Sequence, residues 1–159
     1  MKLVYTLAIA LGLAAGPVSA QSSDQQVSDT TDVELTRSVI QAKKKMIVAA
    51  NVDLTEAESQ GFWPIYNDYQ NETRKLNDRL LALIEDFAAN YEAMTDAKAK
   101  SLLEEAMAIE TDELALKNSY MPKFAKVLPA KKLTQYYQVE NKLKAIIDYD
   151  LASAIPLVK

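Results

Sequence analysis

The sequence predicts an all-α fold of about four helices, with long bent helices paired as antiparallel hairpins. Three observations lead to this prediction. The 159 residues contain three glycines, and only Gly61 lies beyond the first twenty positions, which leaves too few turn formers for a many-stranded sheet. Apolar residues recur at spacings of three and four over long stretches. A helix-start signal precedes each of the two longest stretches.

The first twenty residues have the three parts of a secretory signal peptide. Lys2 provides the positive start, Leu3 to Ala15 form an apolar core, and Val18-Ser19-Ala20 has the small-residue pattern that signal peptidase cleaves. A retained membrane anchor is the alternative, but Gly16-Pro17 interrupts a run that is short for spanning a bilayer. We therefore expect residues 1–20 to be cleaved and the chain to be exported to the periplasm, with secretion as the alternative.

The remaining chain is expected to contain a disordered leader and a single helical domain. Residues 21–31 are rich in Ser, Gln and Asp, a composition that cannot bury a core. Residues 32–159 suit one all-helical domain in length. Its first helix should run from about Val33 to Ala50, with Asp32 as the cap and Lys43-Lys44-Lys45 on a solvated face.

The second helix is expected from Thr55 to about Asn90. Leu54 precedes Thr55, and Glu58 stands three residues later, so the two form a capping box. Pro64 lies inside this segment, close to Gly61, and predicts a kink near residues 60–64. The expected seam has the 4-3 spacing of helices that pack lengthwise, and it consists of Phe62, Tyr66, Tyr69, Thr73, Leu76, Leu80, Leu83 and Phe87.

The third and fourth helices follow in the same manner. Met94-Thr95 opens the third, which should reach about Val127, but Lys98 takes the place of the acid and leaves half a capping box. Its expected inward face includes Leu102, Ile109, Leu116, Tyr120 and Phe124. Pro122 predicts a second bend, Pro129 suits the first turn of the last helix, and Pro156 ends it. Short links make consecutive helices antiparallel neighbours.

The composition excludes most enzyme chemistry. The chain has no His and no Cys, so it lacks an imidazole base, a thiolate nucleophile, zinc ligands and disulfides. With Gly61 alone there is no phosphate-binding loop, and a net charge of −4 argues against nucleic acid. Five acids at positions 104, 105, 110, 112 and 113 match no calcium loop and suit a solvated face. We predict no catalytic residue, no cofactor and no metal.

The helix-start motifs carry a resemblance to a known family. Leu54-Thr55-x-x-Glu58 opens a helix that continues with Phe62-Trp63-Pro64-Ile65-Tyr66, and Met94-Thr95-x-x-Lys98 opens the next one. An exported, Cys-free helical chain with these motifs resembles the LTXXQ-motif family of periplasmic proteins, the Spy/CpxP-like chaperones, over roughly residues 33–154. Glu58 and Lys98 depart from the motif's Gln, and the acidic balance departs from a uniformly basic surface.

The resemblance implies a bent helical hairpin protein, often a cradle-shaped antiparallel dimer, that binds unfolded or partly folded polypeptides without ATP. Charge is uneven, because residues 117–144 hold seven lysines and one acid, Glu140. Since the aromatic residues are too many for one narrow seam, rings beside lysines would form an adaptable surface; the alternative is that the rings cap the ends of the bundle. The predicted client-binding set is Phe62, Trp63, Tyr66, Lys123, Phe124, Lys126, Lys131, Lys132 and Tyr136.

Two other functions are open to such a chain. One is a stress-response adaptor that docks the sensor domain of a membrane kinase, as CpxP-like relatives suggest by resemblance. The other is a metal-sensing helical protein, which the absence of His disfavours.

Overall fold

The computed structural model describes residues 38–158, and all secondary structure among them is helical. A helix ends at residue 51, and α2 (Glu56–Asn90), the short 3-10 helix η1 (Tyr91–Ala93), α3 (Asp96–Ala125) and α4 (Ala130–Ala154) follow. The all-α prediction is confirmed. The expected signal peptide, the leader at 21–31 and the helix start at Val33 lie outside the described residues. The chain divides after Ile40, and the packing below lies within 41–158.

Local capping sets the starts of α2 and α3. The Glu58 N–H donates to Thr55 Oγ1 at 3.3 Å, and the Thr55 N–H donates to Glu58 Oε2 at 2.7 Å, so the predicted capping box is complete. The Lys98 N–H donates to Thr95 Oγ1 at 3.2 Å, but an ammonium group cannot accept the second bond. Lys98 Nζ instead donates to Asp86 of α2 at 2.6 Å. The predicted pair of one full and one half cap is confirmed.

Prolines have different effects at different positions. Pro64 and Pro122 lie inside α2 and α3, which continue through them. Pro129 is the N-cap residue of α4, one position before the predicted first turn, and its carbonyl accepts from the Leu133 N–H at 3.0 Å. The helix ends at Ala154, two residues before Pro156. The expected stop is therefore correct.

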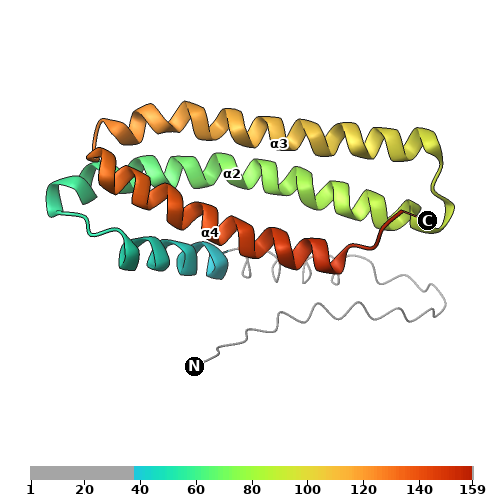
Figure 1. Cartoon of the computed structure of the whole chain (residues 1–159), viewed down its shortest axis with the longest axis horizontal. Coiled ribbons are helices and arrows are strands. Elements are labelled where there is room, and N and C mark those ends of the chain that lie inside the picture. Colours follow the sequence, from blue (N-terminus) through green and yellow to red (C-terminus); the bar gives the residue numbers. More distant parts are fainter. Residues whose placement is uncertain (1–37, 159) are drawn as a thin grey trace, which may run out of the picture. The chain divides into compact units, whose positions relative to one another are not determined.

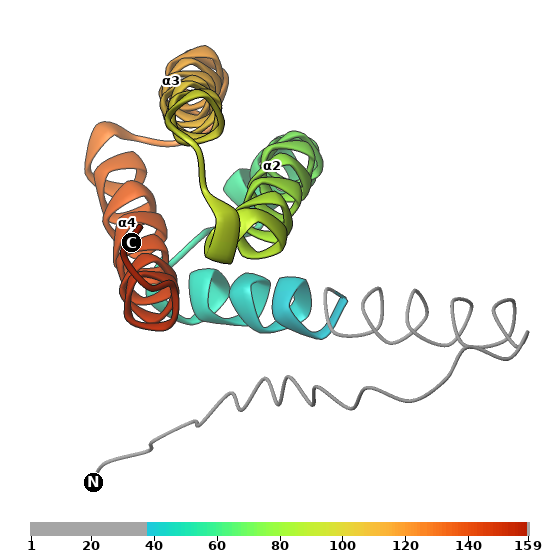
Figure 2. The same cartoon turned by 90° about the vertical axis from the view of Figure 1, so that its right-hand side faces the viewer.

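The long helices run lengthwise, and α2 and α3 pack along each other (Figure 1). Seen end-on, α2, α3 and α4 occupy the corners of a triangle (Figure 2). The helix segment 41–51 lies against both α2 and α4, because Lys44 contacts Gln70 on α2 and Glu140 on α4. The link between α3 and α4 and the link before α2 lie at the same end, here called the linked end.

An aromatic cluster fills the linked end. Phe124 of α3 is fully buried, and its ring centroid lies 4.8 Å from that of Tyr136 on α4 and 5.4 Å from that of Phe62 on α2. One ring therefore joins three helices through contacts that add to the gain from burial. The whole buried cluster consists of Val48, Val52, Phe62, Tyr66, Tyr69, Tyr120, Phe124, Leu128 and Tyr136.

Gly61 permits a close approach between α2 and the α3–α4 link. A Cβ atom added to Gly61 would stand 2.8 Å from Val127 Cγ1 and 3.1 Å from Val127 Cβ. Both distances are shorter than an ordinary van der Waals contact between carbons. The lack of a side chain therefore matters here for packing, since the backbone of Gly61 is helical.

We predict that Gly61→Ala lowers the free energy of unfolding by about 1 kcal/mol or more, because overpacking exceeds the gain of up to about 1 kcal/mol that alanine brings to a helix interior. In a Val127→Ala background, where the methyl group at 2.8 Å is gone and only the Cβ contact at 3.1 Å remains, the same change should cost clearly less. Thermal unfolding followed by circular dichroism of the four chains measures this cycle. A higher melting temperature for Gly61→Ala alone would contradict the packing argument.

Candidate polypeptide-binding surface

Four of the rings predicted to contact clients lie in the core. Phe62, Tyr66, Phe124 and Tyr136 are all buried, so their assignment to an accessible surface is wrong in this structure. The reason is that α2, α3 and α4 each turn aromatic residues toward the same end, where the rings pack on one another. The alternative, that rings fill an end of the bundle, describes these four correctly. Trp63 is partly buried.

The predicted lysines lie apart from these rings. Lys123, Lys126 and Lys131 are exposed near the α3–α4 link, and Lys123 Nζ lies 3.7 Å from the ring centroid of Tyr120. Lys132 is partly buried and donates to Glu58 Oε2 at 2.6 Å, which lowers the pKa of the Glu58 carboxyl. Lys132 thus ties α4 to the capping box of α2. The other three remain available to acidic partners.

A polar group lies among the buried rings. Lys44 Nζ is 2.8 Å from Glu140 Oε2 and donates to Gln70 Oε1 at 3.1 Å. Glu140 is only 6% exposed. Val48 lies one turn after Lys44, so the two side chains share one face of the helix. Because Val48 is buried in the core, Lys44 also points inward. The expectation that Lys44 lies on a solvated face is therefore wrong, whereas Lys43 and Lys45 are exposed.

Several polar atoms in this group have no hydrogen-bond partner among the described residues. They are Tyr66 Oη, Gln70 Nε2, Tyr136 Oη and Glu140 Oε1. Each is buried, and a buried polar atom without a partner costs roughly 1–3 kcal/mol. We call Lys44, Gln70 and Glu140 with the Tyr66 and Tyr136 hydroxyls the polar cluster. In the sequence Glu140 is the lone acid of a lysine-rich stretch, a pattern that does not predict its burial.

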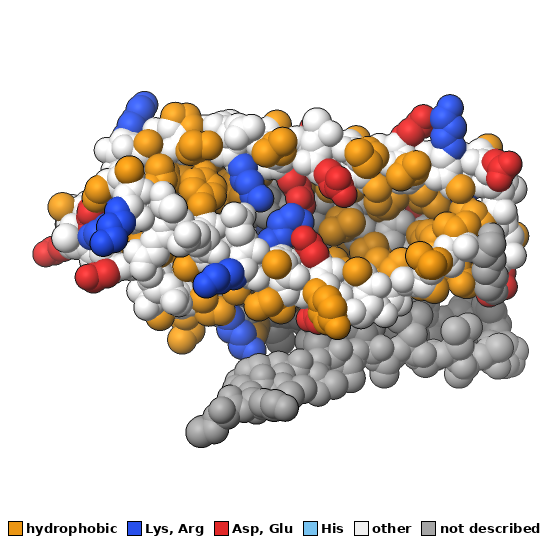
Figure 3. Space-filling model, viewed as in Figure 1, with side chains coloured by type: hydrophobic (Ala, Val, Ile, Leu, Met, Phe, Trp, Pro, Cys, Tyr) orange, Lys and Arg blue, Asp and Glu red, His pale blue; other side chains and the backbone are white. Residues whose placement is uncertain are grey.

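A groove lies among α2, α3 and α4 and extends from Lys44, Tyr69 and Glu140 away from the linked end. Its volume is about 100 Å³, and aliphatic side chains from all three helices line it: Leu76, Leu80, Leu116, Ile147 and Leu151. Figure 3 shows this face, where a hollow with largely hydrophobic walls lies between α3 and α4. The large rings separate the helices at the linked end, and the smaller aliphatic groups farther along do not fill the same spacing.

Charged residues border the groove and connect its walls. Lys144 Nζ lies 3.1 Å from Glu113 Oε2 on α3 and 3.0 Å from Asp148 Oδ1 on its own helix. Lys117 also lines the groove. An apolar floor with a rim of both charge signs suits a polypeptide segment with apolar and charged side chains.

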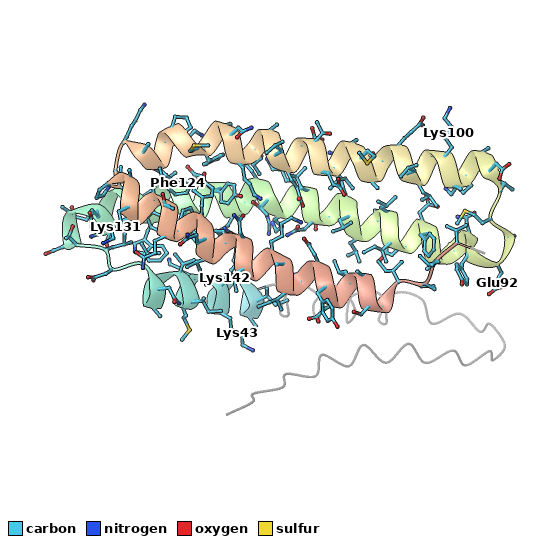
Figure 4. All side chains as sticks on the ribbon, in the orientation of Figure 1. Lys43, Glu92, Lys100, Phe124, Lys131 and Lys142 are labelled. Atoms are coloured by element: carbon cyan, nitrogen blue, oxygen red, sulfur yellow. The ribbon has the colours of Figure 1, made fainter. Side chains whose placement is uncertain are left out.

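A second apolar surface runs along the outside of α3. Leu103, Met107, Leu114 and Met121 are 46 to 63% exposed, and their spacings of four, seven and seven place them on one face. We call them the α3 stripe. The face of α3 that was expected to point inward is a different one, and it is buried at Leu102, Ile109, Tyr120 and Phe124. Figure 4 shows the same division, with Phe124 directed inward and Lys100 outward.

Sequence analysis assigned only the inward face and missed the α3 stripe. The signal was present as a second set of apolar residues on the same helix. Exposed apolar residues that share one helical face form a candidate interaction surface.

Metal ligands, membrane-spanning helices and similarity to known proteins give no further indication of what this surface binds. No group of three or more acidic side chains between residues 38 and 158 is placed to hold a metal ion. None of the helices in this range is both long and apolar enough to cross a membrane. Comparisons with protein-family models, with curated proteins and with solved structures find no match to this chain. The resemblance to the LTXXQ-motif family stays a prediction based on the helix-start motifs.

The polar cluster predicts a loss of stability at alkaline pH. Four tyrosines have a pKa above the ordinary value of 10.0, mainly because they are buried and secondly because Glu140 is negatively charged. They are Tyr66, Tyr69, Tyr136 and Tyr137. A phenol with a raised pKa in the folded state stabilises fully below the unfolded pKa, and this contribution is lost as the pH rises toward the folded pKa. Stability should therefore fall above about pH 10, by up to about 1.4 kcal/mol per pH unit for each buried tyrosine.

Urea unfolding between about pH 9 and about pH 11.5 measures this loss. Tyr136→Phe serves as the matched variant, because it removes one buried phenol and leaves every other ionisable group in place. Its stability should fall less steeply with pH than that of the unaltered chain. Equal slopes for the two chains would exclude Tyr136 from the effect.

Proposed function

We propose that this chain is an exported, ATP-independent chaperone-like protein that binds unfolded or partly folded polypeptides in the periplasm. The observation that carries the proposal is accessible apolar surface on a helical scaffold: the groove lined by Leu80 and Ile147 and the α3 stripe. Surface of this kind offers contact to many sequences without requiring a particular one. The signal-peptide pattern and the motif resemblance support the compartment and the client class.

The mechanism is weak holding at several points. Aliphatic side chains of a client enter the groove, while Lys117 at its border attracts acidic groups. The three exposed lysines near the α3–α4 link extend this attraction, as the sequence predicted for Lys123, Lys126 and Lys131. Since ammonium groups on long stems accept many geometries, binding tolerates clients of different sequence. Apolar contact comes from leucine, isoleucine and methionine in place of the buried rings.

A stress-response adaptor is the second candidate function. The α3 stripe favours it, because apolar residues confined to one helical face are typical of surfaces that dock a single helical partner. Affinity capture from membranes separates the two functions. One membrane protein in stoichiometric amounts supports the adaptor, whereas many proteins in smaller amounts support general holding.

The chaperone proposal predicts that the chain without residues 1–20 suppresses aggregation of a chemically denatured model protein in the absence of ATP. Light scattering during dilution from denaturant measures the effect. The lack of any suppression, even with the chain in excess, would overturn the proposal. A control without the chain and one with an inert protein at the same concentration account for crowding.

The groove predicts a difference between two adjacent isoleucines of α4. Ile147 lines the groove and is 48% exposed, whereas Ile146 is 61% exposed and lies outside it. Ile147→Asp should raise the amount of chain needed for half suppression by about fivefold, the factor that corresponds to about 1 kcal/mol of lost contact. Ile146→Asp, with the same change of charge, should have little effect. Equal effects of the two variants would exclude the groove as the holding surface.

A further inference from the structure

The helix segment 41–51 lies on the face of the bundle that carries the predicted client-binding rings. Val48 and Val52 are buried in the same cluster as Phe62, Tyr66 and Tyr136. With Lys44 they form a series at four-residue spacing: Lys44 and Val48 lie on one face of the helix, and Val52 follows directly after its end. The rings and the acid that receive this series are here called the aromatic face.

The contacts described between the segment and the aromatic face lie along one side of its helix. Besides the two valines and Lys44, Gln135 Nε2 of α4 donates to the Asn51 carbonyl at 2.6 Å. The neighbouring Met46 is 70% exposed, and Ile47 is also exposed. The segment is therefore held from its inner side, while its outer side is exposed.

Polar atoms beneath the segment favour its release. Tyr66 Oη, Tyr136 Oη, Gln70 Nε2 and Glu140 Oε1 are buried without hydrogen-bond partners among the described residues. Gln70 and Glu140 receive Lys44 of the segment, so its departure opens their unpartnered atoms to water or to a polar group of another chain and relieves their share of the desolvation cost. The closed arrangement therefore carries a penalty that an open one lacks.

We propose that segment 41–51 is a built-in occupant of the aromatic face, and that this face takes in its place an amphipathic helix of a client. The client helix carries a basic residue followed by aliphatic residues four and eight positions later. This inference rests on the proposed function and names a second, concealed surface with a defined class of partner.

The side chains of the aromatic face explain the preference for a basic residue followed by aliphatic residues. Glu140 and Gln70 receive the cation through a carboxylate oxygen and an amide oxygen. The surrounding rings of Phe62, Tyr66 and Tyr136 provide apolar contact for side chains of valine size. An acidic residue at the first position would place its charge beside Glu140, and repulsion would reject it. The selection is thus both for apolar spacing and for charge.

Trp63 provides a built-in reporter of this exchange. It is the single tryptophan of the chain, and Lys45 Nζ of the segment lies 5.0 Å from its ring centroid. Release of the segment removes this cation and changes the surroundings of the indole. Fluorescence of Trp63 therefore follows the segment in the full chain without an added label.

The test uses a synthetic peptide with the sequence of residues 41–54, which contains no tryptophan. Val48→Asp in the full chain releases the built-in segment, and Met46→Asp on the exposed side of the same helix is the matched control. The peptide should bind Val48→Asp at least about tenfold more tightly than the control, as measured by Trp63 fluorescence. A peptide with glutamate in place of Lys44 should lose this binding. Val48→Asp should also suppress aggregation at a lower concentration than Met46→Asp.

Equal peptide binding by the two chains would overturn the inference, as would a glutamate peptide that binds as well as the natural one. If circular dichroism shows that Val48→Asp unfolds, Lys44→Glu releases the segment without a change to the apolar contacts, and the same two outcomes apply. Aggregation suppression by the unaltered chain without peptide selectivity removes the aromatic face alone. Peptide selectivity without suppression by any chain removes the proposed function instead.

Discussion

The packing of aromatic rings around Phe124 determines how the other elements are arranged. Its ring centroid lies within 6.4 Å of those of five others, contributed by α2, α3 and α4. These contacts bring three long helices together at the linked end, where Gly61 lets the α3–α4 link approach α2 closely. The same rings hold the helices at a distance that aliphatic residues farther along do not fill. Because the large buried aromatic side chains gather at the linked end, that end is closed and the opposite part of the bundle contains the groove.

The polar cluster determines which segment covers the closed end, and it does so at some expense of stability. A buried ion pair such as Lys44–Glu140 loses hydration that its attraction only partly replaces, so its contribution is chiefly to orientation. Apolar contact alone would let the segment 41–51 shift by one turn along the rings. The requirement that Lys44 meet Glu140 fixes one register, much as a single buried polar residue does in a coiled coil.

Helix boundaries were predictable because their causes are local. Thr55 with Glu58, Thr95 and Pro129 act within one turn of the positions where they stand, so the sequence alone locates three helix starts to within a residue. The burial of Phe62 and Tyr136 depends instead on which faces of distant helices meet, and periodicity marks an apolar face without naming its neighbour. The same limit explains Lys44, whose burial depends on an acid nearly one hundred positions away. The α3 stripe was missed because a helix with two apolar faces gives no local sign of which one is covered.

The separation of the closed end from the grooved end gives a physical reason why, under the proposed function, polypeptides are bound without a chemical reaction. A rigid aromatic cluster holds the helices in place, so the grooved end can keep apolar side chains accessible without collapsing onto them. Collapse would require α4 to approach α2, and the rings of Phe62, Phe124 and Tyr136 oppose that movement at the linked end. Apolar surface that cannot bury itself is stabilised only by contact with another chain. Under the proposed function, the apolar surface that this packing leaves uncovered is what contacts the exposed apolar segments of a client.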